Sequence, residues 1–279
     1  MTHSSRRLAS ALLALAAASV LVLGCGEGDG SPQGVSDDPV ETAAGEKAEP
    51  LSEESARDYA RAVNLRASDL PYAEAEPPED EDEREEDEER TRDTIRAYDD
   101  CVGGGLALSR RLARVRSPAF VSTVAGGFHL FQSEVEVMPT AELAARHSAI
   151  YRSRRGRDCV ERVFPRLFEE EAAETPELGA IEMTPLPVPL PGLEGAFGYR
   201  IETGVTIGGP SPQMTAHSTA RPAATTEIPL FVDLFVFISG QAEISLTVSG
   251  APRAIPERLV RNLLRVLRER SEANRLPDP

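Results

Sequence analysis

Two adjacent segments near the C-terminus most constrain the fold of this chain. Residues 228–238 are IPLFVDLFVFI and residues 241–248 are QAEISLTV, with Ser239 and Gly240 between them. Two segments rich in β-branched and aromatic residues, joined by a short glycine-containing turn, predict an antiparallel β-hairpin. The first is apolar at almost every position, so both of its faces should be covered, whereas the second alternates polar and apolar residues. The chain is therefore expected to form an antiparallel sheet with the first strand of this hairpin near its centre.

Further strands are predicted upstream of the hairpin. Alternating apolar residues and glycine-containing turns predict strands within residues 120–127, 128–138 and 197–207. Prolines at alternate positions within residues 183–192 exclude a central strand and predict an extended edge segment. Residues 208–226 are rich in Gly, Pro, Ser and Thr, and are expected to form a loop.

Helices are predicted between these strands and at both ends of the domain. Apolar residues at helical spacing predict one helix that ends at the glycines 103–105, and others that begin after Ser52, Thr140 and Pro256. The helix after Thr140 should bend or split at Gly156 and Pro165. This order of elements predicts the α+β class, with a curved antiparallel β-sheet flanked by helices.

The N-terminal residues have the form of an export signal. Arg6 and Arg7 precede an apolar run at residues 11–23, which is too short to span a bilayer as a helix of about 20 residues. The segment after residue 25 is rich in Gly, Pro, Ser and acidic residues, so it lacks the apolar side chains that would offset the entropy of ordering it. We therefore expect a signal peptide at 1–24, a disordered tether at 25–52 and a single domain at 53–274.

Cys25, at the end of the apolar run, could be a disulfide partner, a buried core thiol or a site of lipid attachment. The residues Val22-Leu23-Gly24-Cys25 resemble the lipobox of bacterial lipoproteins. This resemblance implies that the mature protein begins at Cys25 and carries several acyl chains, each buried methylene contributing about 0.8 kcal/mol to membrane attachment. The expected location is the outer, extracytoplasmic face of the cell membrane, with the membrane as a partner through the N-terminal lipid.

An acidic block dominates the charge of the chain. The formal net charge is −16, and residues 74–90 contain twelve acidic residues and two arginines. An acidic protein repels nucleic acid, so no nucleic-acid partner is expected. The block lacks the glycine and the ligand spacing of a calcium loop, and a solvated acidic insertion is expected instead. Neither a metal nor a cofactor is predicted.

Cys101 and Cys159 remain as an even pair once Cys25 carries lipid. The chain has only three cysteines, and an exported protein leaves the reducing cytosol. No Cys-x-x-Cys motif indicates redox activity or zinc binding. A disulfide between Cys101 and Cys159 is therefore predicted.

The sequence contains no recognisable catalytic motif. A Gly-x-Ser-x-Gly elbow, a His-Glu-x-x-His motif and a glycine-rich phosphate loop are all absent. Asp233, within an apolar strand, is a candidate ligand-binding residue, although a strand carboxylate paired with an arginine is the alternative. His147 lies on the apolar stripe of its helix and is expected to be a core or boundary residue.

Several motifs in order resemble one bacterial group. They are LRASDLP at 65–71, SPAF at 117–120, DCVERVF at 158–164, the 228–248 hairpin and PERLVRNLL at 256–264. Together they resemble actinobacterial extracytoplasmic lipoproteins and kinase sensor domains of PsbP-like fold, over residues 53–272. The resemblance implies a helix-to-helix disulfide and a cleft that binds a ligand, and the acidic block departs from the usual pattern.

These observations predict a non-catalytic sensor or carrier that binds a small molecule, a lipid or an envelope protein. A secreted hydrolase and a passive envelope assembly protein are the alternatives. A deep cavity between the sheet and a helix would favour binding, whereas a cluster of carboxylates or a Ser-His pair in a cleft would favour the enzyme. A large exposed apolar patch would favour assembly.

Overall fold

A computed structural model describes residues 51–77, 81–104, 106, 111–123, 127–174, 179–207 and 226–276. Within residues 81–91 and 165–174 it describes the backbone alone. The predicted signal peptide, Cys25 and most of the predicted tether lie outside the described residues, as does nearly all of the predicted loop at 208–226.

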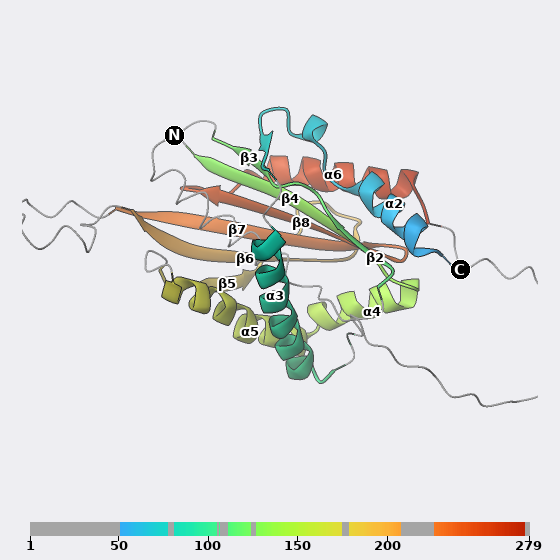
Figure 1. The fold of residues 1–279 in the computed structure, drawn as a ribbon, viewed down its shortest axis with the longest axis horizontal. Helices are drawn as coiled ribbons and strands as arrows, with labels where there is room; N and C mark the ends of the chain where they lie inside the picture. The colour runs from blue at the N-terminus through green and yellow to red at the C-terminus, as the bar shows by residue number, and fades with distance from the viewer. Residues whose placement is uncertain are drawn as a thin grey trace, which may run out of the picture.

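One antiparallel sheet of eight strands forms the centre of the domain (Figure 1). The strands are β1 (Glu74–Ala75), β2 (Ala113–Arg116), β3 (Phe120–Ser122), β4 (Phe128–Val137), β5 (Glu182–Pro185), β6 (Glu194–Ile207), β7 (Thr226–Ser239) and β8 (Ala242–Ala251). Their order is β1-β3-β4-β8-β7-β6-β5, and β2 pairs with β4 beside β3. The predicted hairpin is β7 and β8, and β7 lies inside the sheet between β8 and β6.

Helices cover both faces of this sheet (Figure 1). They are α2 (Glu53–Val63), α3 (Glu81–Val102), α4 (Ala141–Arg152), α5 (Arg154–Glu174) and α6 (Glu257–Ala273), with a short 3₁₀ turn, η1, at Ala67–Asp69. Helices α2 and α6 pack on one face, and α3, α4 and α5 lie over the other. The predicted α+β class, an antiparallel sheet flanked by helices, is confirmed.

The two faces of β7 explain why almost all of its residues are apolar. Phe235 and Phe237 belong to the core beneath α2 and α6. Val232, Leu234 and Val236 point the other way, into the core beneath α3, α4 and α5. Each such side chain contributes about 1.5–3 kcal/mol when it is fully buried. A strand that is covered on both faces therefore anchors both helical layers.

The predicted helix after Thr140 is split in two. The break lies at Ser153, whose hydroxyl accepts a hydrogen bond from the Gly156 amide at 2.8 Å and so caps the first turn of α5. A Cβ at position 156 would lie 1.9 Å from the Ile150 carbonyl oxygen, so only glycine fits this close approach. The helix continues through Pro165, so of the predicted bend or split at that residue the split does not occur.

Three features around the edge of the sheet complete the fold. Strands β1 and β2 were not expected, and β1 falls at the start of the predicted acidic insertion, whose residues 81–90 are helical in α3. The expected extended segment forms the edge strand β5, which ends at Pro185. Among the described helices, none has the length and apolar character needed to cross a bilayer.

Candidate functional site

The face of the sheet beneath α3, α4 and α5 is polar along β4 and β8. Alternate residues of these paired strands point to this face, and the polar ones among them are buried. We call these residues the polar strip: Gln132, Glu134, Glu136, Glu243, Ser245, Thr247 and Ser249. Burying polar side chains is unfavourable unless each finds a partner, so their partners decide what this face can do.

Two of the glutamates are held by arginines from β2 and from a position two residues before it. Arg114 Nε lies 2.8 Å from Glu134 Oε1, and Arg116 Nε lies 3.1 Å from Glu134 Oε2. Arg111 Nη1 lies 2.6 Å from Glu136 Oε1. The strand register favours these pairs, because Arg114 is opposite Glu136 and Arg116 is opposite Glu134.

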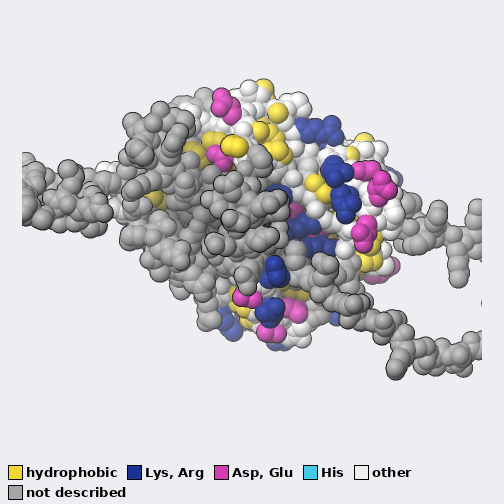
Figure 2. Space-filling model, viewed as in Figure 1, with side chains coloured by type: hydrophobic (Ala, Val, Ile, Leu, Met, Phe, Trp, Pro, Cys, Tyr) yellow, Lys and Arg dark blue, Asp and Glu magenta, His cyan; other side chains and the backbone are white. Residues whose placement is uncertain are grey.

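These ion pairs differ from the charges on the outer surface. Figure 2 shows arginine and acidic side chains interspersed over the described part of one face, where water screens their interactions. By contrast, Glu134 and Glu136 are fully buried, and Arg111 and Arg114 are nearly so. Breaking a buried pair leaves an uncompensated charge, so this cluster fixes β2 against β4.

The pKa values of the two paired glutamates move in opposite directions. Burial raises the pKa of Glu134, but Arg114 and Arg116 together outweigh it, and the net pKa is below its usual value. Burial raises the pKa of Glu136 to about 7, because Arg111 and Arg114 offset only part of it and Glu134 adds to the rise. Glu134 is therefore a fixed negative charge, whereas Glu136 can change its protonation near neutral pH.

Glu243 is the carboxyl group of the polar strip for which the described part of the chain supplies no partner. It lies directly across the strand pair from Glu136, and both side chains are 0 % exposed. Among the described residues, neither oxygen of Glu243 has a hydrogen-bonding partner, and the same holds for Glu136 Oε2. Burial, and then the charges of Glu136 and Glu134, raise the pKa of Glu243 well above its usual value. An unpaired carboxyl of this kind is costly to the fold, which makes Glu243 a candidate functional residue.

Other unpaired polar atoms accompany Glu243 along β8 and on the helix above it. The hydroxyls of Thr247, Ser249 and Tyr98 are buried, and none of the three has a hydrogen-bonding partner within the part of the chain that the structure describes. Tyr98 stacks on Tyr151 of α4, with ring centroids 4.8 Å apart. Burial, then the charges of Tyr199 and Glu243, raise the pKa of Tyr98, so this hydroxyl stays neutral beside the strip.

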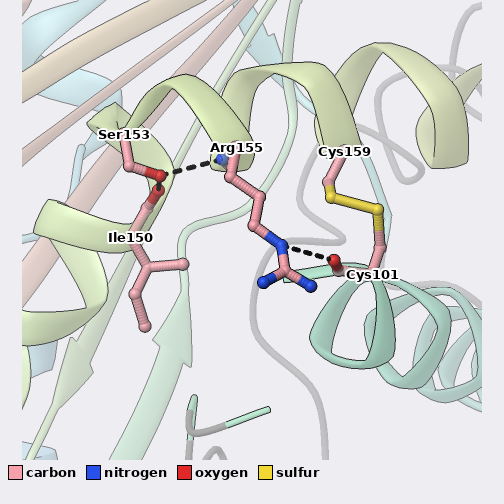
Figure 3. The surroundings of a disulfide bond; sticks show 6 residues. Cys101, Ile150, Ser153, Arg155 and Cys159 are labelled. Atoms are coloured by element: carbon pink, nitrogen blue, oxygen red, sulfur yellow. Dashed lines mark hydrogen bonds between the residues drawn. A yellow bond between two sulfur atoms is a disulfide. The ribbon is translucent and has the colours of Figure 1, made fainter. Parts of the chain in front are cut away.

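Cys101 and Cys159 form a disulfide in the structure, as the sequence suggested. The bond joins the last turn of α3 to α5, with the Cα atoms 5.8 Å apart (Figure 3). Arg155 Nε donates to the Cys101 carbonyl oxygen at 3.0 Å, which adds a second link between the two helices. The helices that cover the polar strip are therefore joined covalently.

Asp233 points to the opposite face of the sheet from the polar strip. Arg200 holds its carboxylate with two hydrogen bonds, Nε to Oδ1 at 2.6 Å and Nη2 to Oδ2 at 2.8 Å. These residues are directly opposite each other on β6 and β7, and a shallow groove bordered by Glu202 and Phe231 lies nearby. Both oxygens of Asp233 are engaged, so Glu243 is the stronger candidate for ligand binding.

Replacing Asp233 with asparagine should lower the free energy of unfolding by about 1–2 kcal/mol, because a charge-assisted hydrogen-bond pair is lost. Arg200 is partly exposed and can turn to water, which limits the loss. Urea unfolding followed by circular dichroism measures this effect. An unchanged unfolding midpoint would show that the pair contributes nothing to stability.

The arginine–glutamate cluster was not anticipated, although the sequence contains a signal for it. Arg114 and Arg116 alternate in one short segment, and Glu134 and Glu136 alternate in another. Two segments with opposite charges at a period of two are expected to pair as neighbouring strands. His147, expected in the core or at its boundary, is fully buried. Among the described residues, no group of three or more His, Cys, Asp or Glu side chains is arranged to hold a metal ion.

Comparison with known proteins gives one structural similarity. No protein-family model and no curated protein sequence matches this chain. The crystal structure of the extracellular domain of PknH from Mycobacterium tuberculosis aligns with 80% of this chain and 98% of that one, at 9% sequence identity and a TM-score of 0.30.

Proposed function

We propose that this chain is an exported, non-catalytic binding protein, anchored by lipid on Cys25 at the outer face of the cell membrane. Its folded domain acts as a sensor or carrier for a ligand in the cell envelope. The signal-like N-terminus, the lipobox and the resemblance to extracytoplasmic lipoproteins and sensor domains support the anchoring and the location.

The observation that carries the binding role is the polar strip. A core that served stability alone would place apolar side chains beneath α3, α4 and α5, as it does along β7. On β8, the chain instead buries Glu243, Thr247 and Ser249 with side-chain atoms that have no partner among the described residues. Unpaired polar groups lower stability by about 1–3 kcal/mol each, and a ligand that pairs with them recovers this energy.

Replacing Cys25 with serine tests the anchor. Serine has no thiol to acylate, so the variant should leave the membrane fraction and lack the mass of the acyl chains. Cell fractionation and intact-protein mass spectrometry measure both effects, and Ser36→Ala in the same segment is the matched control. A Cys25→Ser protein that remains in the membrane and carries lipid would contradict the anchoring.

Native mass spectrometry tests the binding role. The domain purified from its own envelope under non-denaturing conditions should retain a small molecule or lipid, which denaturation releases for identification. A domain that retains no molecule, and binds none from an extract of that envelope, would contradict the proposed function.

A further inference from the structure

An open groove lies beside the disulfide, along the first turns of α5. Its volume is about 440 Å³, which is within the range of about 300–1,000 Å³ that small-molecule sites occupy. The residues that line it are Cys101 of α3 and, from α5, Arg154, Arg155, Asp158, Cys159 and Arg162. The α5 residues recur at intervals of three or four, so one face of the helix presents them to the groove. We call Arg154, Arg155 and Arg162 the groove arginines.

The groove arginines lack the carboxylate partners that other arginines of this domain have. Arg61 lies 3.1 Å from Asp58, and Arg270 lies 2.6 Å from Asp69. Within the described residues, no groove arginine forms an ion pair, although Asp158 is one helical turn from two of them. Their positive charges are therefore available to an anion from outside the chain.

Arg155 is the groove arginine whose position the backbone fixes. Its Nε donates to the Cys101 carbonyl oxygen at 3.0 Å, so the side chain reaches from α5 to the end of α3 (Figure 3). A Cβ at position 103 would lie 3.0 Å from Arg155 Nη1, and the φ of +96° at Gly103 is one that glycine adopts without strain. The disulfide holds the two helices together at this point. A guanidinium that is oriented in advance loses less entropy when it binds an anion.

The charges that line the groove favour one class of anion. Three arginines and one aspartate give the groove a formal charge of +2. A phosphomonoester carries about −1.5 to −2 charges at pH 7, and its oxygens accept the parallel N–H groups of a guanidinium. A carboxylate or a phosphodiester carries a single negative charge and would neutralise only half of the excess.

We propose that this groove binds a phosphomonoester, whose phosphate group contacts the groove arginines. The inference goes beyond the proposed function, because it depends neither on the polar strip nor on the lipid anchor. No residue of the polar strip lines the groove.

Three small anions test the proposal: methyl phosphate, dimethyl phosphate and acetate. Binding to the purified full chain is measured by calorimetry and by ¹H–¹⁵N chemical-shift changes at pH 7 and low ionic strength, where salt screens exposed charges least. Methyl phosphate should bind at least tenfold more tightly than either monoanion, with shift changes at the amides of residues 154–162. Equal binding of the three anions would overturn the assignment to a phosphomonoester.

Three variants separate the groove from general charge effects. Arg162→Gln should weaken methyl phosphate binding at least fivefold, because a charge-assisted hydrogen bond is lost. Asp158→Asn removes the negative charge of the groove and should tighten binding at least threefold, a gain that a damaged fold would not produce. Arg258→Gln is the matched control, because Arg258 is an exposed arginine of α6 without an ion pair among the described residues. Unchanged binding by Arg162→Gln, or equal weakening by Arg162→Gln and Arg258→Gln, would overturn the proposal.

A short-chain lipid distinguishes the two sources of a phosphomonoester, a lipid head group and a soluble molecule. Dihexanoyl phosphatidic acid, at a submicellar concentration, carries the same phosphate group as methyl phosphate. Tighter binding of the lipid would assign the groove to a head group, and equal binding would assign it to a soluble ligand. Either result supports the phosphomonoester.

The outcome for this inference is distinguishable from the outcome for the proposed function. If methyl phosphate fails to bind while a molecule is retained from the envelope, the groove assignment is wrong and the proposed function stands. If methyl phosphate binds while the envelope supplies no ligand, the groove assignment stands and the proposed function is contradicted.

Discussion

Removal of the disulfide is expected to lower the free energy of unfolding by about 4 kcal/mol. Cys101 and Cys159 are 58 residues apart, and cross-linking a loop of this length removes about that much chain entropy from the unfolded state. The test protein carries Cys101→Ala and Cys159→Ala together, so that no free thiol is left to form new disulfides. Guanidinium unfolding of this variant and of the wild type, followed by circular dichroism, gives the difference.

Reduction of the wild type is the matched control for this prediction. A reducing agent should bring the stability of the wild type close to that of the double variant and leave the variant itself unchanged. Helix α3 should lose protection from hydrogen exchange first, because the bond holds its last turn against α5. Equal stability of the oxidised wild type and the variant would mean that the bond makes no contribution to the fold.

The second large effect is a gain in stability at higher pH when Glu243 is replaced by glutamine. In the folded protein, burial keeps the pKa of Glu243 well above its usual value, whereas in the unfolded chain it ionises near pH 4.3. Folding therefore takes up a proton, and the free energy of unfolding falls by about 1.4 kcal/mol per pH unit until the folded pKa is reached. Glutamine does not titrate, so Glu243→Gln should become more stable than the wild type as pH rises toward 8, once the lost proton uptake exceeds the cost of burying the amide.

Other ionisable groups near Glu243 also affect how the free energy of unfolding depends on pH. Glu136, whose pKa is raised to about 7, also makes the free energy of unfolding fall as pH rises, up to about neutral pH. This contribution is present in both proteins. Glu134, with its lowered pKa, acts only at acidic pH and in the opposite direction. Tyr98 and Tyr151 stay neutral throughout, because their pKa values are raised.

The difference between the two stability curves isolates Glu243. Chemical unfolding at intervals between pH 5 and pH 8 should give curves that lie within about 1 kcal/mol at pH 5 and diverge as pH rises. Glu182→Gln, on an exposed strand, should follow the wild type. Parallel curves for the wild type and Glu243→Gln would show that Glu243 is ionised in the fold and has a partner after all.

Together with native mass spectrometry of both proteins, this result bears on why the chain keeps a costly residue. Glu243→Gln is expected to be the more stable protein and the weaker binder. Replacing a side chain that serves packing alone would not raise stability and weaken binding together, because such a side chain has no part in binding. The two measurements on one variant therefore distinguish a functional carboxyl from a structural one.

The main elements of the fold were accessible from local sequence patterns. The β7–β8 hairpin followed from its apolar and alternating residues, and the start of α2 followed from Ser52, whose hydroxyl accepts from the Ser55 amide at 3.1 Å. The break between α4 and α5 was placed only approximately, because Ser153 and Gly156 act together there and either residue alone is ambiguous. Strand β2 was missed because four residues give too short a pattern to separate a strand from a loop.

The polar strip could not be predicted from the same patterns. Alternation of polar and apolar residues along β8 predicts that one face of the strand is exposed to solvent. In the structure, however, both Glu243 and Ile244 are fully buried. Whether a polar face meets water depends on which helices cover it, and that depends on contacts distant in sequence. For the same reason, Asp233 stood out in the sequence because its neighbours are apolar, whereas Glu243 looked like an ordinary surface residue.

The edge strand β5 has a consequence for the behaviour of many copies of the protein together. An uncovered strand edge offers free amides and carbonyls on which a second chain can form a new strand, the first step of β-aggregation. Proline has no amide hydrogen, and prolines occupy every second position from Pro185 to Pro191. At this end of the sheet, the chain therefore carries a built-in barrier to edge-to-edge association, which matters most for a protein concentrated on a surface.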